Sequence, residues 1–368
     1  MPNTLCRRNS FYLWSTVLTL VLIPIEYGRN LPSQDSLKSG REALTTGNYS
    51  QAEDHLRRSI DRVGAPDADT VLAVADLGNL LLIEGRTNEA EPMLNRAIDM
   101  VRSNRTLDQR QLPMLLGALG TLYTKTGRFK ESEDTLKEAL HLGTRLFADT
   151  PVHLANLYND LGVLHLAIGN TGKAKKDLKK ALALLEKKVP DDDRHLATTL
   201  ANLSSLYFTE RKWSLAEPAM LRSLHIVEQS LGREHPDVCT LLSNLGVLYY
   251  AQGKLADAET MHRRALTIRR RAFGTDNAYT AASAANLAEV LAAEGVYDES
   301  RNLFVEALET QERILGKREP AVAATLEQFA RLLRRTGNNV LAEEMEDRAD
   351  SIRVENTFTV SVKKIPAR

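Results

Sequence analysis

The stretch "NLGVLYYAQGKLADAETMHRRAL", residues 244–266, decides the fold of this chain because its pattern recurs at a constant spacing. Its opening "NLG" at 244–246 has counterparts in "NLS" at 202–204 and "NLA" at 286–288, 42 residues away on either side. Self-similarity at a fixed period is the signature of a repeat protein, in which each repeat is one small group of secondary-structure elements. The spacing therefore predicts an array of similar elements.

The same period runs through most of the chain. One position of each repeat is marked by Gly47, Gly85, Gly127, Gly169, Gly253, Gly295 and Gly337, with Arg211 in the fifth repeat. The spacing is 38 residues at the first step and 42 at every later one, and small residues recur seven places before and five places after each mark. We expect eight repeats. Because a left-handed conformation costs a non-glycine residue about 1 kcal/mol or more, we expect the turn at Arg211 to differ.

Each repeat is predicted to contain two amphipathic helices. In the sixth repeat Leu245, Leu248 and Tyr249 share one helical face, at spacings of three and four residues. Ala258 and Ala265 continue the apolar pattern in a second helix. A glycine between the two helices adopts the left-handed conformation that ends a helix at little steric cost. The pattern predicts an all-α fold in which small residues let the paired helices approach closely.

The repeats resemble a known family. The step Leu-Gly-x-x-Tyr in "LGVLYY", with small residues at fixed later offsets, resembles the tetratricopeptide repeat. The 42-residue period and the phrases "LGREHPDV" (231–238) and "LGKREPAV" (315–322) resemble the kinesin-light-chain subclass of this repeat. The resemblance covers about residues 34–352. It implies a right-handed superhelical solenoid of about eight antiparallel helix pairs.

The array is expected to occupy residues 31–352, with its first and last repeats as caps. Ser39 and Glu42 stand where later repeats carry apolar residues, and Asn339 does so in the last repeat. Polar residues suit terminal helices with nothing stacked beyond them, so we expect a complete array. Residues 353–368 alternate apolar and polar side chains, and we expect a loose tail rather than a short edge strand.

Residues 1–30 have a different composition. Arg7 and Arg8 precede the apolar run "FYLWSTVLTLVLIPI" at 11–25, which is the order of a secretory signal. A run of this length is shorter than the roughly 20 residues of a spanning helix. No A-x-A cleavage pattern follows, so an uncleaved membrane anchor remains an alternative, as does a helix leading into the fold. We expect an exported protein, secreted or membrane-anchored through this segment.

The composition excludes several classes of protein. Lys plus Arg and Asp plus Glu both number 48, so bulk charge does not favour binding to nucleic acid or to an acidic membrane surface. Contact with a membrane is expected only through the N-terminal segment. With Cys6 and Cys239 as the two cysteines, a disulfide framework and a four-cysteine zinc site are excluded.

No catalytic constellation is present in the sequence. The nearest approach to a phosphate loop, "AIGNTGKA" at 167–174, has Ala167 and Ala174 where the loop needs Gly and Ser or Thr. His153 and His195 occupy equivalent places in successive repeats, but helix axes about 8–10 Å apart do not readily place both within about 2 Å of one zinc ion. We expect no catalytic residue, no metal and no cofactor.

A protein-binding surface is predicted on the first helices of the repeats. In the resembled family this face lines the concave groove, and side-chain amides there can donate to and accept from a peptide backbone. The amide ladder comprises Asn202, Asn244 and Asn286, extended by Asp160 and Gln328. Phe208 and Tyr250 offer aromatic contacts, and Lys125, Arg331 and Arg335 offer positive charge for acidic side chains. A solvated polar face without a ligand is the alternative.

The sequence favours a noncatalytic scaffold or adaptor that holds a protein or peptide segment in this groove. A self-assembling structural component is one alternative, and a regulatory subunit of an enzyme on another chain is a second. Linkage to a motor protein is not indicated, because no heptad region precedes the repeats. Partner identity and oligomeric state are left open by the sequence.

Overall fold

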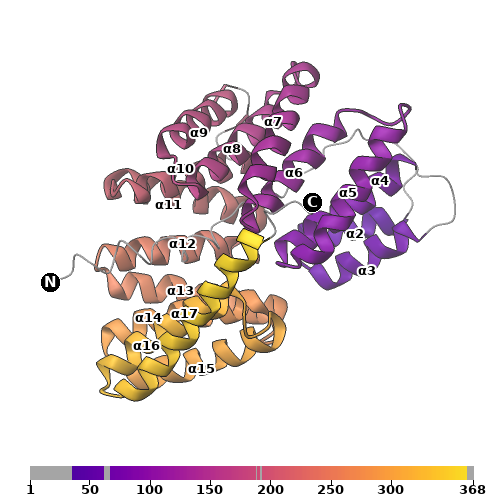
Figure 1. Ribbon diagram of the computed structural model, residues 1–368. Helices are drawn as coiled ribbons and strands as arrows, with labels where there is room; N and C mark the ends of the chain where they lie inside the picture. The colour runs from indigo at the N-terminus through magenta and orange to yellow at the C-terminus, as the bar shows by residue number, and fades with distance from the viewer. Residues whose placement is uncertain (1–34, 62–66, 188, 191–192, 363–368) are drawn as a thin grey trace. The chain divides into compact units, whose positions relative to one another are not determined.

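The computed structural model describes residues 35–61, 67–187, 189–190 and 193–362, with side chains up to residue 354. The predicted leader, residues 1–30, lies outside these ranges. The described residues form sixteen α-helices and no strand (Figure 1). The first helices of the eight pairs are α2 (Asp35–Thr45), α4 (Ala68–Ile83), α6 (Gln111–Lys125), α8 (Pro151–Ala167), α10 (Arg194–Thr209), α12 (Val238–Ala251), α14 (Ala278–Glu294) and α16 (Pro320–Arg335). The second helices are α3 (Tyr49–Ile60), α5 (Thr87–Ser103), α7 (Phe129–Leu146), α9 (Thr171–Leu185), α11 (Trp213–Leu231), α13 (Leu255–Phe273), α15 (Tyr297–Ile314) and α17 (Asn339–Val362).

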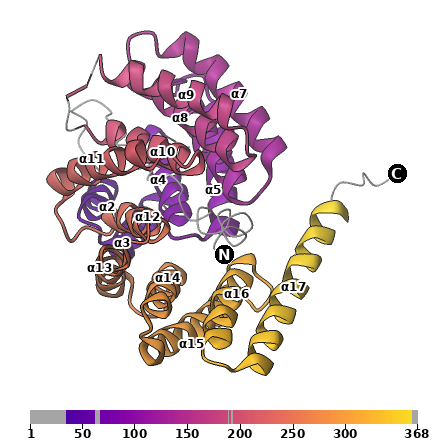
Figure 2. The same ribbon diagram turned by 90° about the vertical axis from the view of Figure 1, so that its left-hand side faces the viewer.

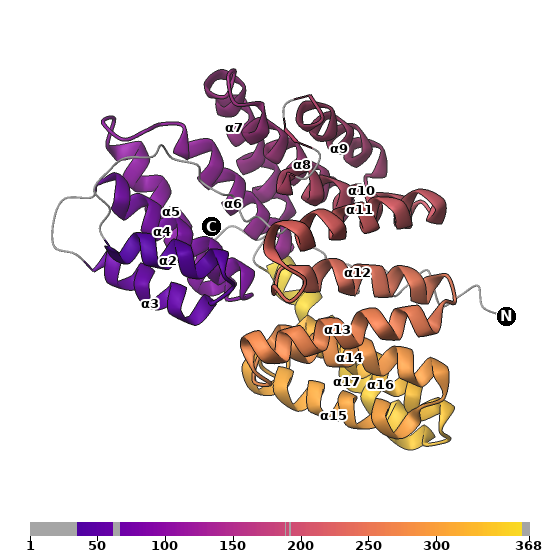
Figure 3. The same cartoon turned by 180° about the vertical axis from the view of Figure 1, so that it is seen from behind.

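The described chain divides into two compact parts, with the division between Leu241 and Leu242 inside α12. The N-terminal part contains α2 to α11, in which each helix packs on its partner and on the next pair, as α2, α3, α4 and α5 do in Figure 3. The C-terminal part contains α13 to α17, and Figure 2 shows α14 to α17 stacked in the same manner. Both parts are all-α repeat solenoids, as the sequence predicts.

Glycines in the first helices allow the two helices of a pair to approach closely. A Cβ atom at Gly120 would lie 2.5 Å from the side chain of Leu136, sixteen residues later in the second helix. Corresponding distances are 3.1 Å for Gly40 and Leu56, 3.0 Å for Gly78 and Leu94, and 2.6 Å for Gly162 and Leu178. The glycine supplies the space that the leucine fills, and this is the physical reason for the recurring small residue.

Serine is accepted at the small-residue positions because its hydroxyl finds a partner across the helix pair. The Ser132 hydroxyl donates to the Gly120 carbonyl at 2.8 Å, and that of Ser300 to the Ala288 carbonyl at 2.6 Å. From the first helix, Ser204 donates to the Ala216 carbonyl at 2.6 Å. These buried hydroxyls are thereby hydrogen-bonded, as buried polar groups must be to avoid a desolvation penalty.

The expectation that Arg211 turns differently is wrong. Arg211 has φ 57°, in the left-handed region where Gly253 has φ 76° in the next repeat. The turns have the same hydrogen bonds: the Lys212 amide donates to the Tyr207 carbonyl at 2.7 Å, and Lys254 to Tyr249 at 2.9 Å. The packing of the two flanking helices therefore requires the same turn at Arg211, although the left-handed backbone conformation is strained for a residue with a Cβ.

The final helix is longer than the sequence analysis predicted. Helix α17 continues to Val362, so the expectation of a loose tail does not hold for the backbone of residues 353–362. No glycine or proline interrupts this stretch before Pro366, and the helix therefore has no local signal to stop at residue 352. Residues 363–368 lie outside the described ranges.

Candidate functional site

The first helices lie on the inner side of the curve in each part. The backbones of α6 and α8, of α8 and α10, and of α14 and α16 approach one another, whereas successive second helices stand further apart among the described pairs. A stack of helix pairs curves toward the side on which its helices are closer together. The residues predicted to bind a partner lie on these first helices, and we refer to their exposed sides as the first-helix face.

The amides of the predicted ladder are largely engaged within the protein. The Asn202 side chain is 4% exposed, and its NH₂ group donates to the Asn159 side-chain oxygen at 3.0 Å, from α10 to α8. Asn244 is equally buried, whereas Asn286 is half-buried. Gln328 donates to Glu289 at 2.8 Å. Asn202 and Gln328 thus lie at junctions between successive first helices, and the role of the ladder residues in binding a partner stays a prediction.

Asp160 occupies a similar junction between α6 and α8. Its side chain is buried and hydrogen-bonded with Thr121, and Gly117 of α6 leaves room for its carboxyl oxygen. Burial raises the pKa of Asp160 to about 7, although the Thr121 hydroxyl acts in the opposite direction. No cation forms an ion pair with Asp160 among the described residues.

The three predicted cations differ in their partners. Arg331 forms an ion pair with Glu289, which compensates its charge. Arg335 donates to the Ala292 carbonyl at 2.9 Å, at the end of α14. Lys125 contacts the Leu82 carbonyl at 3.4 Å, at the equivalent end of α4. Arg335 and Lys125 thus lie near the C-terminal end of a preceding first helix, where the helix dipole favours positive charge.

Lys125 has no carboxylate partner in the described residues. It is half-buried, and burial lowers the pKa of its ammonium group to about 8. Near neutral pH the group is therefore mostly protonated, with one weak hydrogen bond to a backbone carbonyl. A partially desolvated ammonium without a counter-ion favours an added carboxylate.

Asn79, one turn before Leu82 in α4, was missed by the sequence analysis. Its buried side-chain oxygen has no hydrogen-bond partner among the described residues. Thr121 and Asp160 form a hydrogen bond between α6 and α8. One 42-residue period earlier, the equivalent positions hold Asn79 in α4 and Ala118 in α6. A methyl group therefore stands where the partner of Asn79 would be. This substitution, visible once the repeats are aligned, is the signal that could have identified Asn79.

The aromatic residues also have partners inside the protein. Phe208 is buried and packs edge-on against Trp213, with ring centroids 5.1 Å apart. Tyr250 is half-buried, and burial together with the nearby charge of Glu289 raises its pKa. Phe208 is thus a packing residue of its own helix pair, while Tyr250 retains partial exposure.

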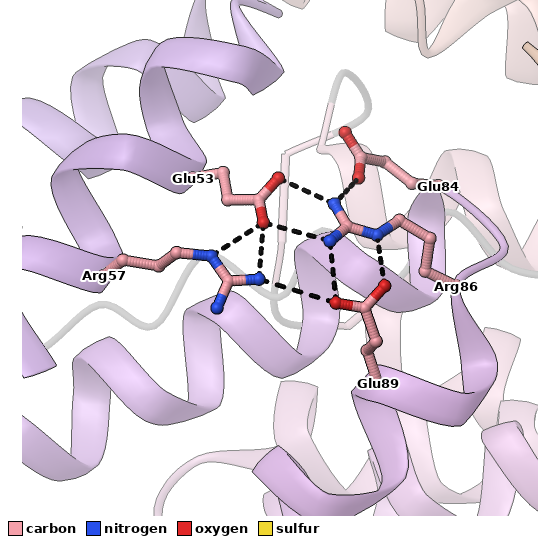
Figure 4. A network of polar contacts seen from close by, with 5 residues as sticks. All are labelled: Glu53, Arg57, Glu84, Arg86 and Glu89. Carbon is pink, nitrogen blue, oxygen red and sulfur yellow. Dashed lines mark hydrogen bonds and ion pairs between the residues drawn. The ribbon is translucent and has the colours of Figure 1, made fainter.

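Ion pairs between repeats were not anticipated from the sequence. Figure 4 shows Arg86, in the turn before α5, bound by Glu53 of α3 at 2.7 Å and by Glu89 at 2.8 Å, with Arg57 and Glu84 completing the network. Further pairs join successive second helices at a separation of 36 residues: Arg102 with Glu138, Arg263 with Glu299, and Arg270 with Glu306. Because most are exposed, each contributes about 0–1 kcal/mol.

The described residues contain no group of three or more potential ligands that could hold a metal ion. His165 lies 2.7 Å from the Asp177 carboxylate, within a single helix pair. His195 lies 2.9 Å from Asp193, at the start of its own helix. None of the described helices combines the length and apolar character needed to span a bilayer.

The chain belongs to the tetratricopeptide repeat proteins. Family models described as "Tetratricopeptide repeat" match residues 37–105, 111–187, 195–271 and 279–352. These four ranges account for nearly all of the described helices, so the predicted family is confirmed. No curated protein shows significant similarity to the sequence.

Several solved structures share the fold. The Rap conjugation gene regulator of the plasmid pLS20, in complex with the Phr* peptide, is 12% identical, with TM-score 0.59 over 90% of this chain and 98% of that one. BtubC (BKLC) from P. vanneervenii is 24% identical, with TM-score 0.50 over 64% and 92%. A putative kinesin light chain from Podosopora anserina is 19% identical, with TM-score 0.47 over 56% and 97%. Kinesin-light-chain-like proteins are thus among those that the chain resembles.

Proposed function

We propose that this protein is a noncatalytic adaptor that binds a segment of a partner protein along the first-helix face of its N-terminal part. The observation that carries the proposal is Lys125, a half-buried ammonium group without a carboxylate partner in the described residues. The Rap regulator, which shares the fold, is described in complex with a peptide. Its low identity supports the fold alone, so the choice of face rests on the contacts within this chain.

In the proposed mode of binding, Lys125 donates to a carboxylate of the bound segment. A charge-assisted hydrogen bond of this kind is shorter and stronger than one between neutral groups. Asn79 accepts from a backbone N–H of the same segment, which satisfies its buried oxygen. Asp160 and Asn202 lie further along the face and are also proposed to contact the bound segment. Each would have to replace its hydrogen bond within the protein by one to the segment.

Panning of a random peptide library against the full chain tests this proposal. The selected peptides should be enriched in Asp, Glu or a free C-terminal carboxylate, and Lys125→Met should weaken their binding at least tenfold. Lys176→Met, which removes an exposed lysine of α9, is the matched control and should bind as the wild type does. Equal affinity of the wild type and Lys125→Met would contradict the proposed site.

Asn202→Ala, Asn244→Ala and Asn286→Ala, combined in one chain, test the amide ladder separately. The proposal expects weaker binding of the selected peptides through the loss of Asn202, which lies in the N-terminal part, with little loss of helix content. Light scattering across a range of concentrations distinguishes the alternative of self-assembly, because an adaptor should not grow into larger oligomers. The alternative of a regulatory subunit would be supported by an enzyme that captures the chain through the same face.

Export through residues 1–30 is a second, separate proposal. It rests on the order of basic and apolar residues in that segment. Fractionation of cells that express the full chain tests it. Recovery from the medium or the membrane fraction supports export, and recovery with the cytosolic marker contradicts it.

A further inference from the structure

The first helix pair contacts the loop that follows the fifth helix pair. The hydroxyl of Tyr49, at the start of α3, donates to the Asp237 carboxylate at 2.5 Å. Gly47, in the turn between α2 and α3, lies against the same loop: a Cβ there would be 2.7 Å from Pro236 and 3.2 Å from His235. All these residues belong to the N-terminal part. Its five helix pairs therefore form a turn whose two ends touch.

The contact is built on a buried carboxylate. Asp237 is 5% exposed, and its second oxygen lies 3.4 Å from the guanidinium of Arg194. The Asp237 backbone N–H donates to the His235 ring at 3.2 Å, which holds the loop in place. Burial and the adjacent Asp237 raise the pKa of Tyr49, so its phenol remains a hydrogen-bond donor. Removal of one partner would leave a buried charge incompletely compensated.

A second loop of the same sequence type provides an internal comparison. In "LGKREPAV" at 315–322, Glu319, Pro320 and Ala321 stand in the places of His235, Pro236 and Asp237. All three are exposed, whereas His235 and Asp237 are buried. The conformation of a loop of this sequence type is therefore not sufficient to bury the positions of His235 and Asp237. Coverage by the first helix pair buries them, and Asp237 is the residue that makes the contact polar and specific.

The first pair is the element best suited to detach. Helices α2 and α3 have 11 and 12 residues, and all other described helices are longer. Among the described helices the first pair packs on one neighbouring pair, so we expect it to open at a lower free energy than pairs with a neighbour on each side. In the described part of the chain, this pair packs on α4 and contacts the loop at 235–237 through Tyr49 and Gly47.

We propose that Tyr49 and Asp237 form a clasp whose release lets the first helix pair detach and admits a partner segment to the first-helix face. The inference rests on the proposed function. Because the two ends of the turn touch, an internal segment of a folded partner cannot pass sideways to Lys125 while the clasp is closed. Release of α2 and α3 opens that path and leaves α4 to α11 in place.

Hydrogen exchange of the full chain tests the clasp itself. Tyr49→Phe and Asp237→Asn should each accelerate exchange in residues 35–61 at least tenfold, with residues 111–187 unchanged. Glu319→Gln, in the exposed equivalent loop, is the control and should exchange as the wild type does. Circular dichroism verifies that the variants fold, and Tyr49→Phe retains the buried ring. Unchanged exchange in residues 35–61 for both variants would overturn the clasp.

The association rate of a fluorescein-labelled acidic peptide, flanked at both ends by folded domains, tests the link to binding. The closed clasp slows association, so Tyr49→Phe should increase the rate several-fold, while a free peptide that can enter from its end should change less. Faster exchange without faster association would overturn the gating role. That result differs from failure of the proposed function, in which Lys125→Met leaves the affinity unchanged.

Discussion

Gly120 of α6 lies directly against Leu136 of α7, and no room remains between them for a methyl group. Leu136 is fully buried, and the corresponding glycines and leucines of three other pairs repeat the arrangement. In each of these four pairs a leucine of the second helix packs against the backbone of the first, so small changes of volume at this contact should alter stability measurably.

Gly120→Ala should destabilise the protein by about 1–3 kcal/mol, because overpacking forces Leu136 or the backbone to move. The change is measured as a lower midpoint of urea unfolding. Gly172→Ala in α9 is the matched control, since a Cβ there meets no atom closer than 3.9 Å. It should be neutral or slightly stabilising, as alanine favours helix over glycine. Equal losses for both variants would refute the packing account.

Arg211→Gly should raise the stability of the fifth repeat by about 0.5–1 kcal/mol, because glycine adopts the left-handed conformation without strain. The thermal unfolding midpoint reports the gain. Gly253→Arg, at the same place in the next repeat, should lower the midpoint by a similar amount. A loss of stability in Arg211→Gly would mean that the arginine side chain contributes more than its backbone costs.

Lys125→Met should stabilise the protein near pH 7 and have less effect near pH 10. Burial lowers the pKa of Lys125 to about 8, below its unfolded value of about 10.4, so the folded state disfavours the charged form. The penalty is fully present below pH 8 and disappears as the pH rises toward 10.4. We expect a gain on the order of 3 kcal/mol at pH 7 in urea unfolding. A gain that is the same at both pH values would contradict this account.

His262→Leu should reduce the sensitivity of the C-terminal part to acid. His262 fills the place of the leucines in other pairs, where a Cβ at Gly246 would lie 2.6 Å from its ring. Burial lowers its pKa to about 4, whereas the unfolded value is about 6.5. The neutral ring is compatible with folding, so stability is lost as the pH falls from 6.5 toward 4. Thermal midpoints at pH 7.5 and pH 5 should differ less in the variant than in the wild type.

Arg86→Met should destabilise the contact between the first two helix pairs by about 1 kcal/mol in low salt, since Arg86 bridges Glu53 and Glu89. The difference from wild type should shrink in about 1 M salt, which screens exposed charges. Lys130→Met is the control, because Lys130 pairs with Asp134 inside its own exposed helix surface. A loss that does not depend on salt would indicate packing by the Arg86 stem instead.

The sequence by itself determined the all-α class, the helix pairs, the family and the small residues at the pair contacts. These features are local, because the 42-residue period and the helical spacing of apolar residues recur in every repeat. The role of a small residue such as Gly120 or Gly246 can therefore be predicted from its position within its own repeat. The predicted first-helix residues were also placed on the intended helices. The hydrogen-bond partners of these residues were not predicted, because whether the Asn202 side chain contacts solvent or Asn159 depends on how closely α8 and α10 approach.

The tertiary structure alone decided which polar groups are compensated and where the chain meets itself. Arg331 finds Glu289 and Lys125 finds a single carbonyl, although both were predicted as cations of one surface. Tyr49 meets Asp237 because small rotations between helix pairs add up over five repeats to a complete turn. The accumulated rotation depends on every intervening contact between helix pairs, so it cannot be predicted from the spacing of residues in the sequence. Packing within a repeat is encoded locally, and contact between distant repeats is a property of the accumulated geometry.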